Sequence, residues 1–453
     1  MSTESSLLDR IRQRTATLSV LGMGHIGLPM ALICARAGFT VTGIDIDADK
    51  VEALRQGKCY VREPELGQIL TECLKTGTFQ VISDASARAI RTSDLVDICV
   101  PTPVRNTKPD LRNFEAALAS VKAGAHKGMI VLIGSTVPPL ATSKSVAAEI
   151  QHLGYKVDED IFLAYCPERL SPGQATREFA ENVRIVGGVG PRSGRIAAEF
   201  FRTVCKNVIV TDALTAELAK VSENTFRDLN IAYANLLALI AESLGADVNE
   251  VIRLANTHPR VSIHKPGLGV GGPCLPKDPY MLINSVPEAP SQLLSVARNL
   301  NRDMSKHVVT LLLRSLRDKE VTIADAKVAV LGVAYKADTE DVTNSPAEFV
   351  VKEFLNTGAT VSVYDPYASE TYGAQKASSI EQALRGADCI ILVTPHTDFK
   401  SILPTLVRRL AKPQCVIFDG PRMLDPTEFR RQGVVYLGTG YGKAALLGRS
   451  IDE

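Results

Sequence analysis

Short runs rich in β-branched residues alternate with helical patterns through the first half of this 453-residue chain. Strands that alternate with helices form a parallel sheet, because each helix carries the chain back along the sheet before the next strand begins. The pattern therefore predicts an α/β fold in which helices cover a doubly wound parallel sheet. The runs predicted as strands are 18–21, 40–44, 96–100, 130–133, 161–165, 185–186 and 208–210.

The second half of the chain repeats this pattern, with strands predicted at 328–331, 360–364, 390–393 and 416–418. The sequence TVTGIDID from Thr40 matches TVSVYDPY from Thr360, and SDLVDICVPTP from Ser93 matches GADCIILVTPH from Gly386. The repeat predicts a second Rossmann-like domain. Its first turn, which begins at Gly332, lacks a three-glycine motif, so this domain need not bind a dinucleotide.

Between the two repeats a helical pattern runs from Asp212, a suitable N-cap, to Leu244, where Gly245 ends it. A helix of this length is expected to span between domains or to build a subunit interface. A second helix is predicted over 291–316. We therefore predict two Rossmann-like doubly wound parallel-sheet domains (1–211 and 319–453), joined by a long central helix and a helical, dimerising middle domain (212–318).

The first predicted strand ends in a GxGxxG motif, which by itself is a weak signal. Here it opens a helix, and an acidic residue, Asp45, ends the next strand. Gly22 would make the tight turn, Gly24 would clear space for a pyrophosphate, and Gly27 would let helix and strand pack closely. Asp45 would bind the ribose hydroxyls and repel a 2′-phosphate, which favours NAD over NADP. The alternative is a Rossmann-like fold whose site is empty.

Net charge, cysteine content and the lack of a long apolar segment limit the possible partners and the cellular compartment. The net charge is +1, which gives no footprint for nucleic acid or an anionic membrane. Nine cysteines without a CxxC pair argue against disulfides and a zinc site, and they favour a reducing compartment. The polar N-terminus lacks a signal core, and the most apolar helical stretch (231–241) is too short to span a bilayer. We expect a cytoplasmic protein.

Polar residues follow several predicted strands, at the edge where a parallel sheet binds ligands. Thr102 and Thr136 stand there beside prolines or valine, and a turn-forming role explains them equally well. Glu168 and Arg169 follow the strand at 161–165, where a carboxylate can act as a general base or form an exposed ion pair.

On the long helix, Lys220, Asn224 and Arg227 recur at i, i+4 and i+7 on one face. Such a face is either a binding surface or a solvated side. The same two interpretations apply to His258 and Arg260 in a later loop, although a guanidinium suits a phosphate well.

One cysteine lies in a glycine-rich turn, in the stretch GLGVGGPCLPKDP from Gly267 to Pro279. Glycines let the backbone approach a ligand closely, and a nearby cation such as Lys277 favours the nucleophilic thiolate. The alternative is a buried structural cysteine in a tight loop. The glycines, the charged neighbours and the upstream dinucleotide motif favour a catalytic role for Cys274.

Taken together, these motifs closely resemble the UDP-glucose/GDP-mannose dehydrogenase family of NAD-dependent nucleotide-sugar 6-dehydrogenases. The resemblance covers essentially the whole chain in order. The segments that carry it are 22–27, 135–137, 167–169, Lys220 with Asn224, 267–278 and 332–336.

The resemblance implies that the C6 hydroxyl of a UDP-sugar is oxidised twice, through a thiohemiacetal and a thioester on Cys274, while two NAD molecules are reduced. It implies further catalytic roles for Lys220, Asn224, Asp278, Glu168 and Thr136. NAD would be bound by Gly22, Gly24, His25, Ile26, Gly27, Asp45, Lys50, Thr102 and Thr136. The UDP-sugar would be bound by Arg169, Leu170, Lys220, Asn224, Arg227, His258, Arg260, Gly271, Tyr335 and Lys336, the last two from a C-terminal UDP-sugar-binding domain.

The run from Pro167 to Gly173 and the His258-Pro-Arg260 sequence resemble the branch that oxidises UDP-N-acetylhexosamines, with UDP-N-acetylmannosamine favoured and UDP-N-acetylglucosamine or UDP-glucose as alternatives. The family also implies a homo-oligomer, at least a dimer, in which Arg260 reaches the neighbouring subunit. Asn344 and Pro273 depart from the family pattern, which often has Arg and a polar residue there. A two-electron β-hydroxyacid dehydrogenase, which needs no cysteine, and a non-catalytic NAD-binding sensor remain open as other functions.

Overall fold

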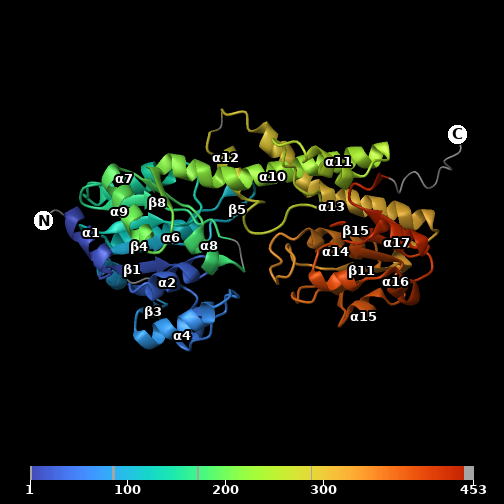
Figure 1. The fold of residues 1–453 in the computed structure, drawn as a ribbon, viewed down its shortest axis with the longest axis horizontal. Helices are drawn as coiled ribbons and strands as arrows, with labels where there is room; N and C mark the ends of the chain where they lie inside the picture. Colours follow the sequence, from blue (N-terminus) through green and yellow to red (C-terminus); the bar gives the residue numbers. More distant parts are fainter. Residues whose placement is uncertain (1–2, 84–86, 171–172, 287, 443–453) are drawn as a thin grey trace. The chain divides into compact units, whose positions relative to one another are not determined.

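The computed structural model describes residues 3–83, 87–170, 173–286 and 288–442 (Figure 1). These residues form two compact units, and each is described by itself. The first comprises Met1–Glu223 and Tyr280–Glu288, and the second comprises Asn224–Pro279 and Ala289–Glu453. The division into three domains expected from the sequence, with boundaries after residues 211 and 318, stays a prediction. No helix in the described ranges is long and apolar enough to cross a membrane.

The first unit is built on an eight-stranded sheet with the order β10-β9-β8-β7-β4-β1-β2-β3. Its strands are β1 (Thr17–Leu21), β2 (Thr40–Ile44), β3 (Phe79–Ile82), β4 (Leu95–Ile98), β7 (Ile130–Ile133), β8 (Phe162–Tyr165), β9 (Arg184–Gly188) and β10 (Val208–Asp212). A separate hairpin joins β5 (Val104–Arg105) and β6 (Lys108–Pro109). The helices are α1 (Thr3–Gln13), α2 (Gly27–Arg36), α3 (Ala48–Arg55), α4 (Leu66–Thr76), α5 (Ala87–Arg91), α6 (Arg112–Gly124), η1 (Ala141–Val146), α7 (Ala147–His152), α8 (Ala175–Glu181) and α9 (Pro191–Arg202).

Helices cover both faces of this sheet, because its central strands are apolar on both sides. Along β7, Ile130 and Leu132 face one core while Val131 and Ile133 face the other. Such continuous apolar strands are typical of a parallel sheet covered on both faces. The α/β doubly wound fold predicted from the sequence is therefore confirmed.

One connection in the first sheet differs from the all-parallel expectation. Strands β8 and β9 pair antiparallel, while β9 and β10 pair parallel. Among the described residues that connect β8 to β9, the seven-residue helix α8 is the one regular element. It returns the chain to the sheet at the same end, whereas a parallel pair needs a crossover along the length of the strands.

The second unit is built on a six-stranded parallel sheet with the order β13-β12-β11-β14-β15-β16. This is the Rossmann order, with the topological switch point between β11 and β14. The strands are β11 (Lys327–Leu331), β12 (Thr360–Tyr364), β13 (Gln375–Lys376), β14 (Cys389–Leu392), β15 (Val416–Asp419) and β16 (Val435–Gly438). The helices are α11 (Val248–Ala255), α13 (Gln292–Asp318), η2 (Ile323–Asp325), α14 (Pro346–Asn356), α15 (Ile380–Leu384), η3 (Thr397–Ser401), α16 (Pro404–Leu410) and α17 (Pro426–Arg431). The short helix α12 (Asp278–Ile283) begins in the second unit, and from Tyr280 onward its residues belong to the first.

The long helix predicted between the repeats is α10 (Ala213–Leu244), which contains 32 residues. The Asp212 carboxylate caps its first turn by accepting from the Thr215 amide at 2.9 Å. Gly245 follows its last residue with φ +77°, the left-handed conformation that ends many helices. The predicted helix and both of its ends are confirmed.

Candidate active site

The glycine turn after β1 has the geometry that a dinucleotide phosphate requires. Gly22 has φ +95°, and a Cβ there would lie 2.4 Å from the Cys99 carbonyl oxygen. A Cβ on Gly27 would lie 1.9 Å from the Gly22 carbonyl oxygen, whereas one on Gly24 would meet no atom within 4 Å. Gly24 therefore leaves open space beside the start of α2, where backbone amides and the helix dipole favour an anion. His25 and Ile26 lie in the same turn, and His25 is exposed.

Asp45 lies directly beside this turn. The register of β1 and β2 places Leu21 opposite Ile44, so that Asp45 follows at the carboxyl edge of the sheet. Its carboxylate accepts from the Met23 amide at 2.7 Å and from the Asp47 amide at 3.0 Å. A half-buried carboxylate with remaining acceptor capacity fits ribose hydroxyls.

The other residues predicted to contact the cofactor lie on neighbouring elements of the first unit. The Thr102 hydroxyl donates to the Thr136 carbonyl at 2.6 Å, which joins the loops after β4 and β7. Lys50 lies on α3, and its ammonium is 3.4 Å from the Asp47 carboxylate. The donors and the open backbone at this edge fit an NAD molecule.

Glu168, one of the predicted catalytic carboxylates, lies at a buried ion pair that the sequence did not indicate. Its Oε1 accepts from the Arg184 guanidinium, which also donates to the Pro167 carbonyl at 3.2 Å. The guanidinium lies over the rings of Phe179 and Phe201, with its Cζ 4.6 and 4.8 Å from their centroids. Among the described residues, Glu168 Oε2 has no hydrogen-bond partner. Glu168 and Arg184 also line a small cavity of about 10 Å³.

Asp97, on β4, adds a second buried carboxyl to the same core. Burial first, and the Glu168 charge second, raise the pKa of Asp97 to about 7. Its Oδ1 lacks a hydrogen-bond partner within the described ranges. The first unit therefore holds an acidic group that can exchange a proton near neutral pH.

The remaining predicted residues of the first unit follow β8 or lie on α10. Arg169 binds Glu223 with two nitrogens, at 3.1 and 2.6 Å, and donates to the Val183 carbonyl at 2.9 Å. Leu170 and Lys220 are half-buried. Ser171 and Pro172, which complete the predicted Pro-Glu-Arg-x-x-x-Gly run, lie outside the described residues.

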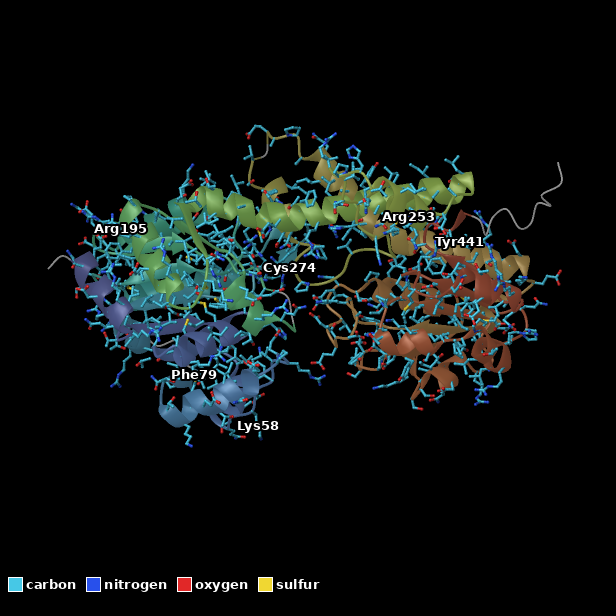
Figure 2. The ribbon with its side chains drawn as sticks, in the orientation of Figure 1. Lys58, Phe79, Arg195, Arg253, Cys274 and Tyr441 are labelled. Carbon is cyan, nitrogen blue, oxygen red and sulfur yellow. The ribbon has the colours of Figure 1, made fainter. Side chains whose placement is uncertain are left out.

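The cysteine loop belongs to the second unit, and Cys274 lies at its surface (Figure 2). Of the nine cysteines in the chain, seven are buried, Cys59 is half-buried and Cys274 is exposed. The loop depends on glycine at two points, Gly269 and Gly272, which have φ +147° and +93°. The Cys274 carbonyl accepts from the Lys277 and Asp278 amides at 3.0 and 2.9 Å, which starts α12. The loop thus presents a sulfur to solvent from an ordered turn.

A buried carboxylate lies directly behind this turn. Asp278 is fully buried, and its two oxygens accept from the Lys277 ammonium at 2.5 Å and from the side-chain amide of Asn224 at 2.6 Å. The Lys277 cation therefore pairs with Asp278. The structure thus brings Asn224 of α10 and Asp278 together.

Two segments far apart in the sequence hold the glycines of the loop. A Cβ on Gly271 would lie 2.8 Å from the Tyr335 Cβ, and one on Gly272 would lie 2.8 Å from the Tyr335 ring. The Gly272 amide donates to the Thr343 carbonyl at 2.7 Å, and the Asn344 side chain donates to the Gly272 carbonyl at 3.1 Å. Asn344, which departs from the family pattern, therefore contacts the cysteine loop.

A buried polar network anchors the start of the loop. Asn235 of α10 accepts from the Gly267 amide at 2.9 Å and donates to Asn301 of α13 at 2.9 Å. Asn301 in turn donates to the Asp228 carboxylate at 2.9 Å, and so does Arg298 at 2.5 Å. Sequence reasoning missed these residues because their partners come from other helices and loops, without a local motif.

The remaining predicted substrate residues of the second unit are exposed. Arg227 lies on α10, and Lys336 lies in the turn after β11. His258 and Arg260 lie in the loop after α11, where the Arg260 amide donates to His258 Nδ1 at 3.4 Å. Within the described ranges, no group of three His, Cys, Asp or Glu side chains could hold a metal ion.

The sequence matches three domain profiles of one family. These are the NAD binding domain of the UDP-glucose/GDP-mannose dehydrogenase family at residues 16–205, its central domain at 214–303 and its UDP binding domain at 329–426. The first range contains the glycine turn, the second contains the cysteine loop, and the third contains β12 to β15 with most of β11.

Similar proteins act on related sugar nucleotides. The UDP-N-acetyl-D-mannosamine dehydrogenase of Pyrococcus horikoshii is 38% identical over 427 residues, covering 94% of this chain and 99% of that protein. A solved structure of UDP-D-ManNAc dehydrogenase from the same organism has a TM-score of 0.89 at 37% identity, covering 94% and 100% of the two chains. The NDP-N-acetyl-D-galactosaminuronic acid dehydrogenase of Methanosarcina mazei has a TM-score of 0.85 at 32% identity, covering 98% and 99%.

Proposed function

The chain belongs to the UDP-glucose/GDP-mannose dehydrogenase family, and we propose that it oxidises the C6 hydroxyl of a UDP-N-acetylhexosamine to a carboxylate with NAD. UDP-N-acetylmannosamine is the favoured substrate, because the similar protein from Pyrococcus horikoshii is named for that sugar. The observation that carries the proposal is Cys274, the exposed cysteine, held in a glycine turn in front of the buried Asp278–Asn224 pair.

The glycine turn of the first unit supports NAD as the cofactor. The open backbone at Gly24 and the start of α2 would hold the pyrophosphate, and Asp45 would hold a ribose. His25, Ile26, Lys50, Thr102 and Thr136 would contribute further contacts. When bound, NAD supplies the hydride acceptor for an alcohol and for a thiohemiacetal.

Cys274 performs the covalent step. Its thiolate adds to the aldehyde carbon to form a thiohemiacetal, and at the thioester stage the same sulfur is the leaving group when water attacks. Lys220 exchanges a proton with the sugar oxygen or stabilises the oxyanion, and Asn224 donates a hydrogen bond beside it. Asp278 holds Asn224 in place through the 2.6 Å hydrogen bond.

Glu168 and Asp278, with Thr136, position or activate the water that hydrolyses the thioester. Two observations support Glu168 in this role. Its Oε2 has no hydrogen-bond partner among the described residues, and the cavity of about 10 Å³ that it lines is near the size that holds one water. Asp278 already accepts from Lys277 and Asn224, which suits it to orient neighbouring groups.

The UDP-sugar is held by side chains from several loops and from α10. Tyr335 and Lys336 bind it from the C-terminal domain (319–453), and Gly271 brings the backbone close to it. The remaining contacts are proposed for Arg169, Leu170, Lys220, Asn224, Arg227, His258 and Arg260.

A dimer through α10 is part of the proposal. Phe226, Tyr233, Leu236, Ile240 and Leu244 are exposed large apolar residues spaced by seven, three, four and four positions along this helix. Such spacing gathers them on one stripe, as at a helix-pairing interface. Arg260 would then act in the neighbouring subunit's site. Light scattering of the wild type and a Tyr233→Glu variant tests this, and a wild-type monomer would contradict it.

Counting NADH against four substrates tests the reaction. UDP-ManNAc, UDP-GlcNAc, UDP-GalNAc and UDP-glucose are supplied in turn, and two NADH per sugar oxidised are expected with one of them. A ratio of one with an aldehyde or ketone product indicates a two-electron dehydrogenase. NAD binding without oxidation of any sugar nucleotide indicates a sensor.

A cysteine exchange tests the covalent step. Cys274→Ser should lower uronate formation by at least about 10³-fold, because a hydroxyl at this position is a far weaker nucleophile and leaving group. Cys59→Ser, at the half-buried cysteine, is the matched control and should keep the wild-type rate. Uronate formation by Cys274→Ser at the wild-type rate would contradict the mechanism.

A further inference from the structure

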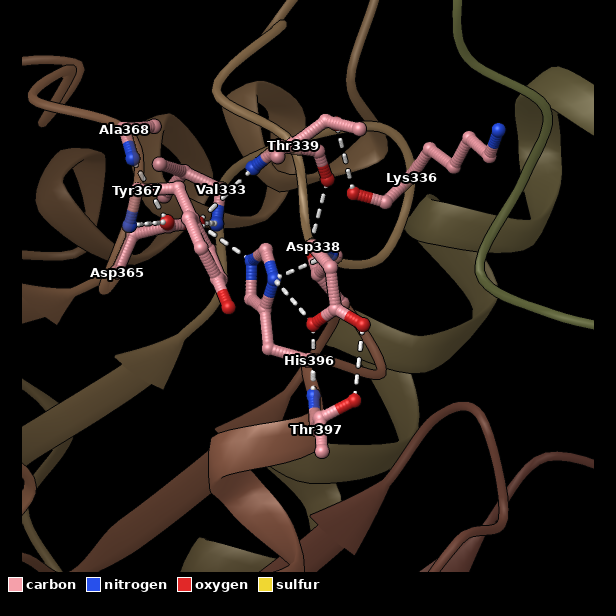
Figure 3. Close-up of polar contacts among 11 residues, drawn as sticks. Val333, Lys336, Asp338, Thr339, Asp365, Tyr367, Ala368, His396 and Thr397 are labelled. Atoms are coloured by element: carbon pink, nitrogen blue, oxygen red, sulfur yellow. Dashed lines mark hydrogen bonds and ion pairs between the residues drawn. The ribbon is translucent and has the colours of Figure 1, made fainter. Parts of the chain in front are cut away.

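A fully buried histidine lies beside the turn that follows β11 (Figure 3). Its Nε2 is 2.9 Å from the Asp365 carboxylate, and its Nδ1 accepts from the Asp338 amide at 2.9 Å. The backbone amide can only donate, so Nδ1 carries a lone pair and the ring proton is on Nε2. His396 is therefore a neutral imidazole that uses one nitrogen as acceptor and the other as donor. The rings of Tyr367 and Phe399 pack on it, with centroids 5.1 and 5.4 Å away.

The two nitrogens of His396 hold the two ends of one turn. At the start of the turn, the Asp365 oxygen bonded to His396 also accepts from the Val333 and Ala334 amides, at 2.7 and 3.2 Å. At the end of the turn, His396 binds the Asp338 amide directly. The neighbouring Thr397 adds two hydrogen bonds to the Asp338 carboxylate, at 2.9 and 2.8 Å. Residues 335–337 thus lie between the two points that His396 holds. Within the turn, the Tyr335 amide also donates to the Asp341 carbonyl at 2.9 Å, and the Lys336 carbonyl accepts from Thr339 at 3.1 Å.

The turn at 335–337 lies against the cysteine loop of the same unit. The Tyr335 side chain packs on Gly271 and Gly272 of the cysteine loop. Lys336 is exposed, and in Figure 3 its side chain extends away from the His396 cluster. A shift of the turn would therefore move a proposed substrate contact and the support of the cysteine loop together.

We propose that His396 is a positioning residue for UDP-sugar binding, which it controls by clamping both ends of the turn that carries Tyr335 and Lys336. The inference rests on the proposed function, in which these two side chains contact the UDP-sugar. His396 itself is buried beneath the turn and does not touch the ligand. Its loss should therefore weaken UDP binding and raise KM far more than it lowers kcat.

Two substitutions of His396 each remove one of its two hydrogen bonds, the one to Asp365 or the one from the Asp338 amide. His396→Asn keeps an acceptor near the Nδ1 position, for the Asp338 amide, and removes the donor to Asp365. His396→Gln keeps a donor near the Nε2 position, for Asp365, and removes the acceptor for Asp338. Each should raise the Kd of UDP about tenfold, the expected effect of one lost buried hydrogen bond, and His396→Ala should exceed both. Calorimetry with UDP and steady-state kinetics with the UDP-sugar measure these effects.

Asp388→Asn provides the matched control. Asp388 is also buried, accepts from the Lys327 amide at 2.9 Å, and lies at the opposite end of β14. It should lower the melting temperature and leave the Kd of UDP unchanged. If Asp388→Asn weakens UDP binding as much as the His396 variants do, the effect is a general loss of stability and the proposal fails.

Hydrogen exchange separates this proposal from the proposed function. The amides of 335–337 should exchange faster in the Asn and Gln variants than in the wild type, with or without UDP. Folded His396 variants with wild-type exchange and a wild-type Kd overturn the positioning role. Faster exchange in the variants, with no UDP binding or UDP-sugar oxidation by the wild type, overturns the proposed function and leaves the clamp of the turn intact.

Discussion

In both units an aspartate lies beside the turn after the first strand of the Rossmann repeat. Asp45 follows Ile44, which pairs with Leu21, and Asp365 follows Tyr364, which pairs with Leu331. Each carboxylate accepts from a backbone amide of the turn, Met23 in the first unit and Val333 in the second, at 2.7 Å. Each Rossmann repeat thus places an aspartate at the equivalent position, directly after its second strand.

The two acids differ in what surrounds them. Asp45 accepts from two backbone amides and is half-buried. Asp365 accepts from four backbone amides and from His396; its side chain is fully buried, although the residue as a whole is half-buried like Asp45. By strand register His396 stands where the first unit has Thr102. One sheet keeps its acid available for a ligand, and the other fills the equivalent place with its own imidazole.

The turn after β1 and the turn after β11 also differ in how much space they leave for a ligand. Gly24 and Gly27 of the first unit correspond by register to Ala334 and Ala337 of the second. The added Cβ atoms stand where a pyrophosphate would approach the first turn. The second sheet therefore uses its switch point to hold a turn of the protein.

Buried acids in the two units should respond to pH in opposite directions, and this is the largest effect we expect. The pKa of Asp97 is raised to about 7 from 3.8, so the folded first unit retains a proton that the unfolded chain releases. Stability should fall by roughly 4 kcal/mol as pH rises from 4 to 8, because this range spans most of the interval between the two pKa values. Urea unfolding of wild type and Asp97→Asn at pH 4 and pH 8 measures this, since an amide cannot ionise.

Asp365 provides the contrast. Burial raises its pKa, but hydrogen bonds from His396 and backbone amides outweigh burial and hold the pKa below its usual value of 3.8. Its stabilisation is present above about pH 4 and is lost only as pH falls further. Equal pH dependence of the wild type and Asp97→Asn between pH 4 and 8 would contradict the assignment for Asp97.

Replacing single glycines of the turn after β1 by alanine should distinguish a glycine needed for packing from one needed for NAD binding. Gly27→Ala should cost about 3 kcal/mol of stability, because the new Cβ would overlap the Gly22 carbonyl. Gly24→Ala should keep the wild-type melting temperature and raise the Kd of NAD about tenfold, since its Cβ enters open space that the phosphates need. Thermal melts and NAD titrations distinguish them. A stable Gly27→Ala protein with normal NAD affinity would show that the turn is less constrained than its geometry indicates.

The same substitution at the two equivalent acids should give different readouts. Asp365→Asn should cost about 2 kcal/mol of stability, because several buried donors lose a charged acceptor, and it should leave the Kd of NAD unchanged. Asp45→Asn should raise the Kd of NAD about tenfold and reduce the preference over NADP. If Asp365→Asn weakened NAD binding and Asp45→Asn did not, the roles assigned to the two sheets would be reversed.

At the amino edge the two sheets are alike, and here we expect the smallest effects. Asp94 accepts from the Thr17 amide and pairs with Arg10, while Asp388 accepts from the Lys327 amide and pairs with Lys412. Asp94→Asn and Asp388→Asn should each cost about 1 kcal/mol. Neither should change the affinity for NAD or UDP. A selective loss of NAD affinity in Asp94→Asn would extend the functional difference between the sheets to this edge.

The central strands could be predicted from the sequence because they are apolar on both faces and end in a turn motif. The edge strands β3, β13 and β16 were missed. All three are short. Buried and less buried residues alternate along β3 and β16, and both residues of β13 are exposed, so each gives a weaker signal than a fully buried strand. The reversed direction of β9 and β10 relative to β8 was also missed, because strand direction depends on the path of the connection.

For the candidate site, a local motif predicted the turn geometry at Gly22 and the exposed sulfur of Cys274. Arg184 and Asn235 were missed because each acts on a residue far away in the sequence, Glu168 and Gly267. His396 did have a signal, since aligning the two repeats by strand register sets it opposite Thr102. The contacts of His396 with Asp365 and Asp338 could be seen only in the three-dimensional arrangement.

The exposure of one sulfur among nine has a practical consequence. A maleimide dye or spin label should attach to the natural chain first at Cys274, because burial raises the pKa of the half-buried Cys59 thiol and slows its reaction. The same accessibility makes Cys274 the point at which an electrophilic inhibitor built on a uridine scaffold would form its bond.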